Sequence, residues 1–196
     1  MTAQTLNAGR ATPISDETLI RQIAGGHKLA MRALFARHQV KVYRFALRIV
    51  GDGALAEDVV SETFIDAWQH ADRFEGRSSV STWLLGIARH KALTAANRRP
   101  TESLDCEQAQ SVVDTANDPE AALGDKDRGT VIRRCLQALS PEHAEIIDLV
   151  YYQEKSIKEI VEILGIPDNT VKTRMFYARK RLAALVAAEG IDRAAA

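Results

Sequence analysis

The stretch SIKEIVEILGIPDNTVKTRMFYARKRL, residues 156–182, contains two helical patterns separated by a short break. The first pattern begins with Ser156 and Glu159, which have the spacing of a capping box, and continues with apolar residues at helical intervals. Gly165-Ile166-Pro167 then interrupts it, and a basic pattern follows. Two helices joined by a short turn that contains glycine form a helix-turn-helix unit. This stretch therefore predicts a helical C-terminal region with the geometry of a duplex-DNA reader.

The second helix of this unit is expected to have two different faces. The apolar face, predicted to lie in the core, consists of Val171, Met175, Ala178 and Leu182. The opposite face and its margins carry the candidate DNA-binding residues Lys172, Thr173, Arg174, Phe176, Tyr177, Arg179, Lys180 and Arg181. Such side chains can read base edges and hold phosphates in the major groove. The alternative is a solvated basic helix with two exposed aromatic residues, but the capped helix and turn before it favour DNA binding.

The remaining periodic segments also predict helices. In the N-terminal half they cover residues 15–23, 29–52, 54–74 and 81–99. Ser15 or Asp16 is expected to cap the first helix, glycines bracket the end of the second, and Ser81 is a possible cap of the fourth. Ser140-Pro141 marks a further helix start. No segment alternates apolar and polar residues with the period of an amphipathic strand.

Residues 101–125 interrupt the helical patterns with a segment that has seven acidic and no basic residues. The segment lacks apolar periodicity, and loops of this length are uncommon inside a compact domain. We therefore expect an all-α fold with two small helical domains joined by a flexible acidic linker, the C-terminal domain containing the helix-turn-helix. The expected divisions are a disordered N-terminus (1–14), a first domain (15–100), the linker (101–127), a second domain (128–188) and a tail (189–196).

Several classes of protein are disfavoured by what the sequence lacks. No apolar run approaches the roughly 20 residues that span a bilayer, and the N-terminus has no signal-peptide core, so we expect a cytoplasmic protein without membrane insertion. Cys106 and Cys135 form no metal pattern with the five histidines and are interpreted as reduced thiols, with redox sensing as the alternative. Because no nucleophile–base pair, metal set or phosphate loop is apparent, we expect neither an enzyme nor a cofactor.

The helix predicted over residues 54–74 carries a candidate protein-docking face. Asp58, Glu62, Ile65 and Gln69 lie opposite the apolar stripe of this helix. A solvated face rarely needs an isoleucine between carboxylates, which favours a protein partner. The alternative is an ordinary acidic face with one stray apolar residue.

A second candidate surface follows in the same domain. A loop of small residues, 76–81, leads into Trp83 and a helix bearing Arg89, His90 and Lys91. Backbone donors, hydroxyls and a basic helix suit a single nucleic-acid strand with exposed bases. For Trp83 itself, packing in the core is the alternative.

These residues resemble those of a bacterial extracytoplasmic-function (group IV) RNA polymerase sigma factor. AEDVVSETFIDAW…RFEGRSSVSTWLLGIAR looks like the second sigma domain of that family, and LSPEHAEIIDLVYYQEKSIKEIVEILGIPDNTVKTRMFYARKRL looks like the fourth. The resemblance implies an alternative sigma factor that directs promoter-specific initiation, with core RNA polymerase, promoter DNA and an anti-sigma factor as its partners.

The resemblance also implies roles for individual residues. Residues expected to bind the clamp helices of the largest polymerase subunit are Asp58, Ser61, Glu62, Ile65, Trp68 and Gln69. Residues expected at the minus-10 element are Arg77, Ser78, Ser79, Trp83, Arg89, His90 and Lys91. Residues expected at the minus-35 element are Lys172, Thr173, Arg174, Phe176, Tyr177, Arg179 and Lys180.

Two other functions remain as alternatives: a stand-alone helix-turn-helix regulator, and a sigma mimic that titrates an anti-sigma factor.

The linker adds a hypothesis about the shape of the isolated chain. About 25 residues span roughly 30 Å as a coil, whereas two promoter elements two helical turns apart are separated by roughly 70 Å. We therefore expect the isolated chain to be compact and the polymerase to stretch it.

Overall fold

The computed structural model describes residues 14–98 and 122–189, and within them the chain is helical, without strands. The helices are α1 (Asp16–Ala24), α2 (Lys28–Val50), α3 (Gly53–Gln69), a 3₁₀ turn η1 (Ala71–Arg73), α4 (Val80–Arg98), α5 (Ala122–Gln137), α6 (Pro141–Ile147), a π-helical segment η2 (Asp148–Tyr152), α7 (Ile157–Leu164) and α8 (Asp168–Ala188). The all-α prediction is therefore confirmed. The acidic segment 101–121, Cys106 and nearly all of both predicted terminal extensions lie outside the described residues.

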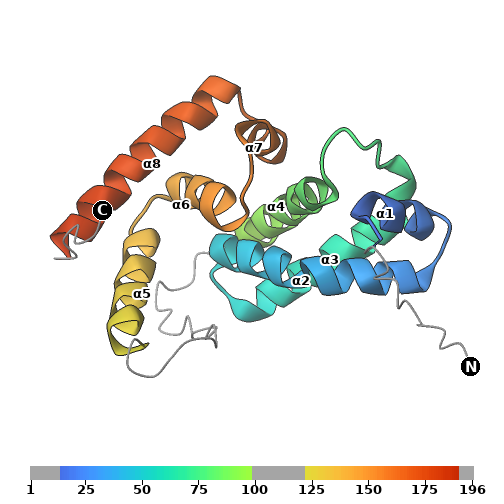
Figure 1. Ribbon diagram of the computed structural model, residues 1–196, viewed down its shortest axis with the longest axis horizontal. Coiled ribbons are helices and arrows are strands. Elements are labelled where there is room, and N and C mark those ends of the chain that lie inside the picture. Colours follow the sequence, from blue (N-terminus) through green and yellow to red (C-terminus); the bar gives the residue numbers. More distant parts are fainter. Residues whose placement is uncertain (1–13, 99–121, 190–196) are drawn as a thin grey trace, which may run out of the picture.

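The first group of helices, α1 to α4, is held by one apolar core. The long helix α2 packs against α1, α3 and α4 (Figure 1). Its buried residues Leu34, Val42 and Phe45 meet Phe64 of α3 and Leu84 of α4 in this core. Burial of this apolar surface is what fixes four amphipathic helices in one bundle.

The second group, α5 to α8, is built around the helix-turn-helix unit. The long α8 packs against α5, α6 and α7, and Val171 and Ala178 are the residues it buries completely. Met175 and Leu182 are partly buried on the same face. This agrees with the predicted apolar face and turns the basic face of α8 outward.

Several helix ends follow the local sequence. The Ser15 hydroxyl accepts the Thr18 N–H at α1, and Ser156 and Glu159 form the predicted capping box at α7. Helix α4 differs from the prediction, because it begins at Val80 and the Ser79 hydroxyl accepts the Thr82 N–H. Ser81 is therefore inside the first turn of α4 and does not cap it.

Gly165 ends α7 in the left-handed region, with φ 66°. A Cβ added there would meet nothing within 4 Å, so only backbone strain opposes a substitution. We expect Gly165→Ala to lower the free energy of unfolding by about 1 kcal/mol in a urea titration. Gly86→Ala is the matched control: the site is equally open but lies inside α4, so we expect stabilisation by about 0.5–1 kcal/mol. Equal stability of Gly165→Ala and the native chain would contradict the left-handed cap.

The two groups of helices contact each other, mainly through α4 against α7 and α2 against α6 (Figure 1). Near the second contact, Arg48 Nε of α2 lies 2.9 Å from Oδ1 of the fully buried Asp148. The Arg48 guanidinium also stacks over the Tyr152 ring, 4.1 Å from its centroid. The described residues are therefore one compact assembly of two helical units.

Two further expectations concerned membrane spans and the cysteines. In the described part of the chain, no helix is both long and apolar enough to cross a bilayer. Cys135 is a free, buried thiol on α5.

Candidate nucleic-acid and protein interfaces

The outward face of α3 carries the predicted protein-docking residues side by side. Asp58, Ser61, Glu62, Ile65 and Gln69 are all exposed. Ile65 is 56% exposed, so its side chain is part of this surface and not of the core. An apolar side chain framed by carboxylates is a surface suited to a protein partner with basic groups.

An apolar groove beside this face was not predicted. It has a volume of about 620 Å³ and is lined by Met31, Phe35, Trp68 and the side chains of Lys28 and Arg32. Phe35 lies edge-on to the Phe64 ring at 4.8 Å but remains 37% exposed. The groove joins Trp68, a predicted docking residue, to the N-terminal half of α2. Met31 and Phe35, four residues apart in the sequence, were the signal that could have revealed it.

The loop before α4 and the start of α4 bring together the predicted single-strand-binding residues. Arg77 is highly exposed and pairs with Glu75 in the same loop. Ser78 and Ser79 are half-buried at the end of the loop. Trp83 packs against Phe74, with ring centroids 5.2 Å apart, and is only partly buried. Trp83 therefore combines core contact with a surface that a base can reach.

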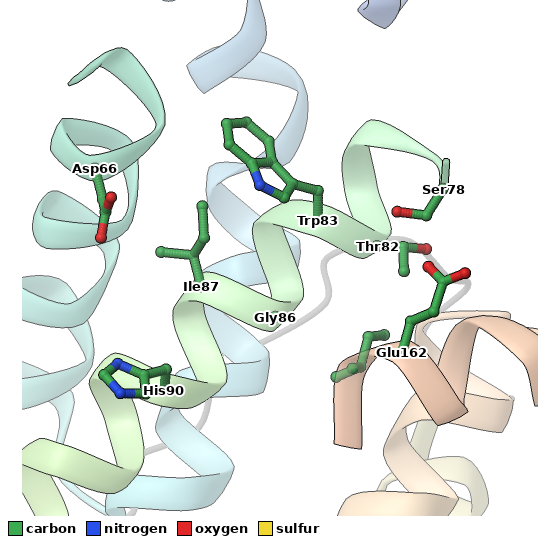
Figure 2. A pocket seen from close by; sticks show the side chains of 9 residues that line it. Asp66, Ser78, Thr82, Trp83, Gly86, Ile87, His90 and Glu162 are labelled. Carbon is green, nitrogen blue, oxygen red and sulfur yellow. The ribbon is translucent and has the colours of Figure 1, made fainter. Parts of the chain in front are cut away.

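Beside Trp83 is an open pocket of about 460 Å³ (Figure 2). Its walls are Trp83, Gly86, Ile87 and His90 along α4, Ser78 and Thr82 at its start, Asp66 of α3, and Glu162 and Ile163 of α7. Figure 2 shows Asp66 and Glu162 on opposite sides of α4. Most of the pocket belongs to the first helical unit, but α7 of the second unit closes one side.

Asp66 is a charged pocket residue that sequence reasoning missed. Lys91 Nζ lies 3.1 Å from Oδ2, and His70 Nδ1 lies 2.5 Å from Oδ1. Burial alone would raise the pKa of Asp66, but the hydrogen bonds from Lys91 and His70 outweigh it and lower the pKa. Lys91, a predicted DNA contact, is thus held by an ionised carboxylate at the edge of the pocket.

Arg89 is the other predicted DNA contact that already has an acidic partner. Its Nε donates to Glu145 Oε1 at 2.7 Å, and Nη2 lies 3.4 Å from Oε2. Glu145 belongs to α6, so this is a two-point pair between the two helical units. In this arrangement Arg89 is engaged, whereas His90 beside it is exposed.

The outer face of α8 is open to solvent over its whole length. Phe176 is 62% and Tyr177 is 54% exposed, and their rings meet edge to face at 5.4 Å. Lys172 pairs with Asp168 at 2.9 Å, and Arg174 lies 3.6 Å from Glu142. Thr173, Arg179, Lys180 and Arg181 are exposed around them. The predicted duplex-reading residues are therefore gathered on one accessible face.

Glu159 connects α7 to the loop before α4. One of its oxygens, Oε1, accepts from Thr82 Oγ1 at 2.6 Å and from Ser79 Oγ at 3.0 Å. The other, Oε2, accepts from Ser156 in the capping box. Burial raises the pKa of Glu159, but the donors Thr82, Ser156 and Ser79 prevail and lower the pKa to about 2. Glu159 is therefore held in place as an ionised carboxylate. No sequence pattern linked it to Ser79 and Thr82, which lie 80 and 77 positions away along the chain.

The structure therefore separates three surfaces: an acidic-apolar face on α3, a loop and pocket at α4, and a basic-aromatic face on α8. The described residues contain no group of three or more His, Cys, Asp or Glu side chains arranged to bind a metal ion.

Comparison with known proteins divides the chain into the same two units. The Sigma-70 region 2 family model matches residues 34–100, and the Sigma-70 region 4 family model matches residues 130–182. The chain is 33% identical over 171 residues to the ECF RNA polymerase sigma factor SigL of Mycobacterium tuberculosis, covering 87% of this chain and 96% of SigL. It is 31% identical over 172 residues to SigW, an ECF sigma factor of Bacillus subtilis, covering 83% and 92% of the two chains.

Among solved structures, the chain resembles CnrH in its complex with the cytosolic domain of CnrY. The TM-score is 0.65 at 26% identity, and the match covers 88% of this chain and 97% of CnrH. With both family regions in order and near-complete coverage of these relatives, the chain belongs to the extracytoplasmic-function (ECF) family of RNA polymerase sigma factors.

Proposed function

We propose that this protein is an alternative sigma subunit that carries core RNA polymerase to a specific set of promoters. In this proposal the α3 face docks on the clamp helices of the largest polymerase subunit. The loop before α4, with Trp83 and the pocket beside it, holds the displaced minus-10 strand, and α8 reads the minus-35 duplex. The observation that carries the proposal is that one chain presents a loop with an aromatic pocket, a separate basic-aromatic helix face and a third, acidic-apolar face.

The chemistry of each surface supports its assigned partner. The pocket beside Trp83 offers an aromatic face, hydroxyls and a histidine, which suit an extruded base. The exposed Lys172, Phe176 and Tyr177 suit base edges and phosphates in a major groove. Ile65 and the groove next to Trp68 provide apolar surface for the polymerase.

The proposed division of the chain follows from these roles. Residues 15–100 form the second sigma domain, residues 128–188 form the fourth, and the acidic residues 101–127 join them. Helix α5 begins at Ala122, so the second unit gains helical turns from the end of that connecting segment.

A protein inhibitor is also proposed. CnrH, which shares the fold, was solved bound to the cytosolic domain of CnrY. By analogy, an anti-sigma factor holds this chain inactive in the cytoplasm until a stress signal releases it. The role is one of transcription initiation and not of catalysis by the chain itself.

Run-off transcription tests the proposal. Purified core polymerase is mixed with the chain and a library of promoter-containing templates, with core alone as the control. We expect transcripts with defined start sites only when both are present. A chain that binds duplex DNA but neither associates with core nor directs initiation would instead be a stand-alone regulator.

A further inference from the structure

An acidic side chain lies within the surface that is proposed to hold the minus-10 strand. Asp66 of α3 lines the pocket beside Trp83 together with Ile87 and His90 of α4, and Figure 2 shows it facing them. The Asp66 side chain is 27% exposed, so a strand in the pocket would meet its charge. Because a carboxylate repels the phosphates of a strand, an acid at this place opposes binding unless it also has an effect that favours binding.

Asp66 holds a cation of α4 in place. Lys91 Nζ lies 3.1 Å from Asp66 Oδ2, and the two residues come from different helices. A lysine side chain loses conformational freedom when it is fixed in one position. Since Asp66 already restricts Lys91 in the absence of DNA, part of that loss precedes binding and does not weaken it.

The ion pair still allows Lys91 to bind a second anion. An ammonium group has three N–H donors, and the contact with Oδ2 needs one of them. The Lys91 side chain is 28% exposed and adjoins His90, an exposed residue of the pocket wall. A phosphate oxygen can therefore accept a charge-assisted hydrogen bond from the ammonium while Asp66 continues to hold it.

A third residue fixes the orientation of the Asp66 carboxylate. His70 Nδ1 lies 2.5 Å from Asp66 Oδ1 and 3.1 Å from the Asp66 carbonyl oxygen. His70 is the C-cap residue of α3 and follows Asp66 by one helical turn. Each oxygen of the carboxylate therefore has its own partner, and the side chain cannot rotate without losing one of them.

This arrangement lies entirely within the first helical unit. Asp66 is near the end of α3, Lys91 is in the second half of α4, and these two helices pack against each other. Arg89 differs, because its acidic partner Glu145 belongs to α6 of the second unit. The position of Lys91 is thus set by its own unit.

We infer that Asp66 is a positioning residue for the minus-10 strand: it holds the Lys91 ammonium at the edge of the pocket beside Trp83, ready for a phosphate of the strand whose base enters that pocket. The inference rests on the proposed function and deepens it. Asp66 acts through Lys91 and does not itself bind DNA. The other reading of the same contacts is an ion pair that only fastens α3 to α4.

Asp66→Asn distinguishes these readings by the sign of its effect. Asparagine has the shape of aspartate and keeps an oxygen that can accept from His70, but it has no charge with which to hold an ammonium. If Asp66 only fastens the helices, removing a negative charge beside the DNA should tighten binding by the folded protein. If Asp66 positions Lys91, binding should weaken in spite of the lost repulsion. We expect a loss of about tenfold, which corresponds to about 1.4 kcal/mol at 25 °C.

The assay uses holoenzyme, formed from core polymerase and the full chain, and a labelled single strand. The strand carries the minus-10 region of a template that native holoenzyme transcribes, and fluorescence anisotropy gives its dissociation constant at several salt concentrations. Loss of one phosphate contact to a single strand lowers the salt slope by about 0.7, and we expect this change in Asp66→Asn and in Lys91→Met alike. Asp72→Asn is the matched control, because Asp72 is exposed in η1 of the same unit and the change in charge is identical. We expect the control to bind at least as tightly as the native chain.

A double-mutant cycle shows whether Asp66 acts through Lys91. In a chain that already carries Lys91→Met, Asp66→Asn should cause no further loss, since the ammonium that Asp66 positions is gone. A urea titration shows whether each variant folds. Should asparagine disturb the fold, Asp66→Ser is a second variant without the carboxylate, and the same results are expected of it.

Three results would each overturn the inference. The strand could bind the Asp66→Asn holoenzyme as tightly as the native one, or more tightly. The loss could be as large in the Lys91→Met chain as in the native chain, or the salt slope could stay unchanged. These results leave the proposed function intact, whereas failure of native chain plus core in run-off transcription would remove the proposed function and this inference together.

Discussion

Asp58→Arg combined with Glu62→Arg is expected to reduce run-off transcription at least about 100-fold, because the chain no longer associates with core polymerase. The two carboxylates are exposed one helical turn apart on α3, on the same face as Ile65. Reversing both charges replaces attraction to a basic partner with repulsion, and like charges placed opposite each other at an interface cost several kcal/mol. At about 1.4 kcal/mol per tenfold, a loss of about 2.8 kcal/mol gives the expected 100-fold reduction.

If the α3 face is the docking surface, the Asp58→Arg, Glu62→Arg variant must lose binding to core polymerase while it retains binding to DNA. Pull-down of core polymerase measures the first, and anisotropy with duplex DNA measures the second, since α8 is untouched. Glu17→Arg with Asp72→Arg is the matched control, because both carboxylates are exposed in the same helical unit and the change in charge is identical. Core binding that survives in the α3 variant, or falls equally in the control, would show that this face is not the docking surface.

Local sequence was sufficient for most of the helices and for the surfaces that lie on single elements, although α5 (Ala122–Gln137) begins inside the segment that was expected to be a flexible linker. As predicted, Ser15 caps the start of α1, and the Ser156–Glu159 box caps the start of α7. Gly165 ends α7, also as predicted. The exposed face of α8 followed from a 3.6-residue period alone, because a long helix with one buried side must present the other. These features depend on residues within one or two turns of each other.

Features that depend on contacts between distant segments were not predicted. Nothing near Glu159 in the sequence indicates that one of its oxygens would meet Ser79 and Thr82 in addition to capping α7. Asp148 is a charged residue within an apolar run of the sequence, yet it is completely buried at the start of a π-helical segment. The wider turn, in which the Gln153 N–H donates to the Asp148 carbonyl, also has no local pattern.

Ser81 illustrates a failure of local reasoning itself. Ser79, Ser81 and Thr82 are all plausible helix caps in a run of hydroxyl residues. In the structure Ser79 is the cap, while the hydroxyls of Thr82 and Ser81 bind Glu159 and Lys155 of the other unit. A tertiary contact therefore decides between caps that local propensity cannot separate.

Lys172→Glu is expected to abolish recognition of the upstream duplex, with a loss of at least about 100-fold, while core binding is unchanged. Lys172 is in the first turn and a half of α8, where its side chain is 54% exposed and pairs with Asp168. An acidic residue near a helix N-terminus is compatible with the helix dipole, so the fold is expected to survive. The substitution removes a base or phosphate contact and places a negative charge against the DNA.

The assay uses an upstream duplex from a template that native holoenzyme transcribes, with Arg133→Glu on α5 as the control. Arg133 is an exposed cation of the same unit, lies on α5 and donates a hydrogen bond to Thr130. Lys172→Gln then separates the two possible roles of the lysine. If Lys172 holds a phosphate, the glutamine variant should weaken binding to all sequences and lower the salt slope by about one. If it reads a base, discrimination at one position should fall by about 1–3 kcal/mol with little change in slope. Retention of full upstream binding in Lys172→Glu would remove Lys172 from the interface.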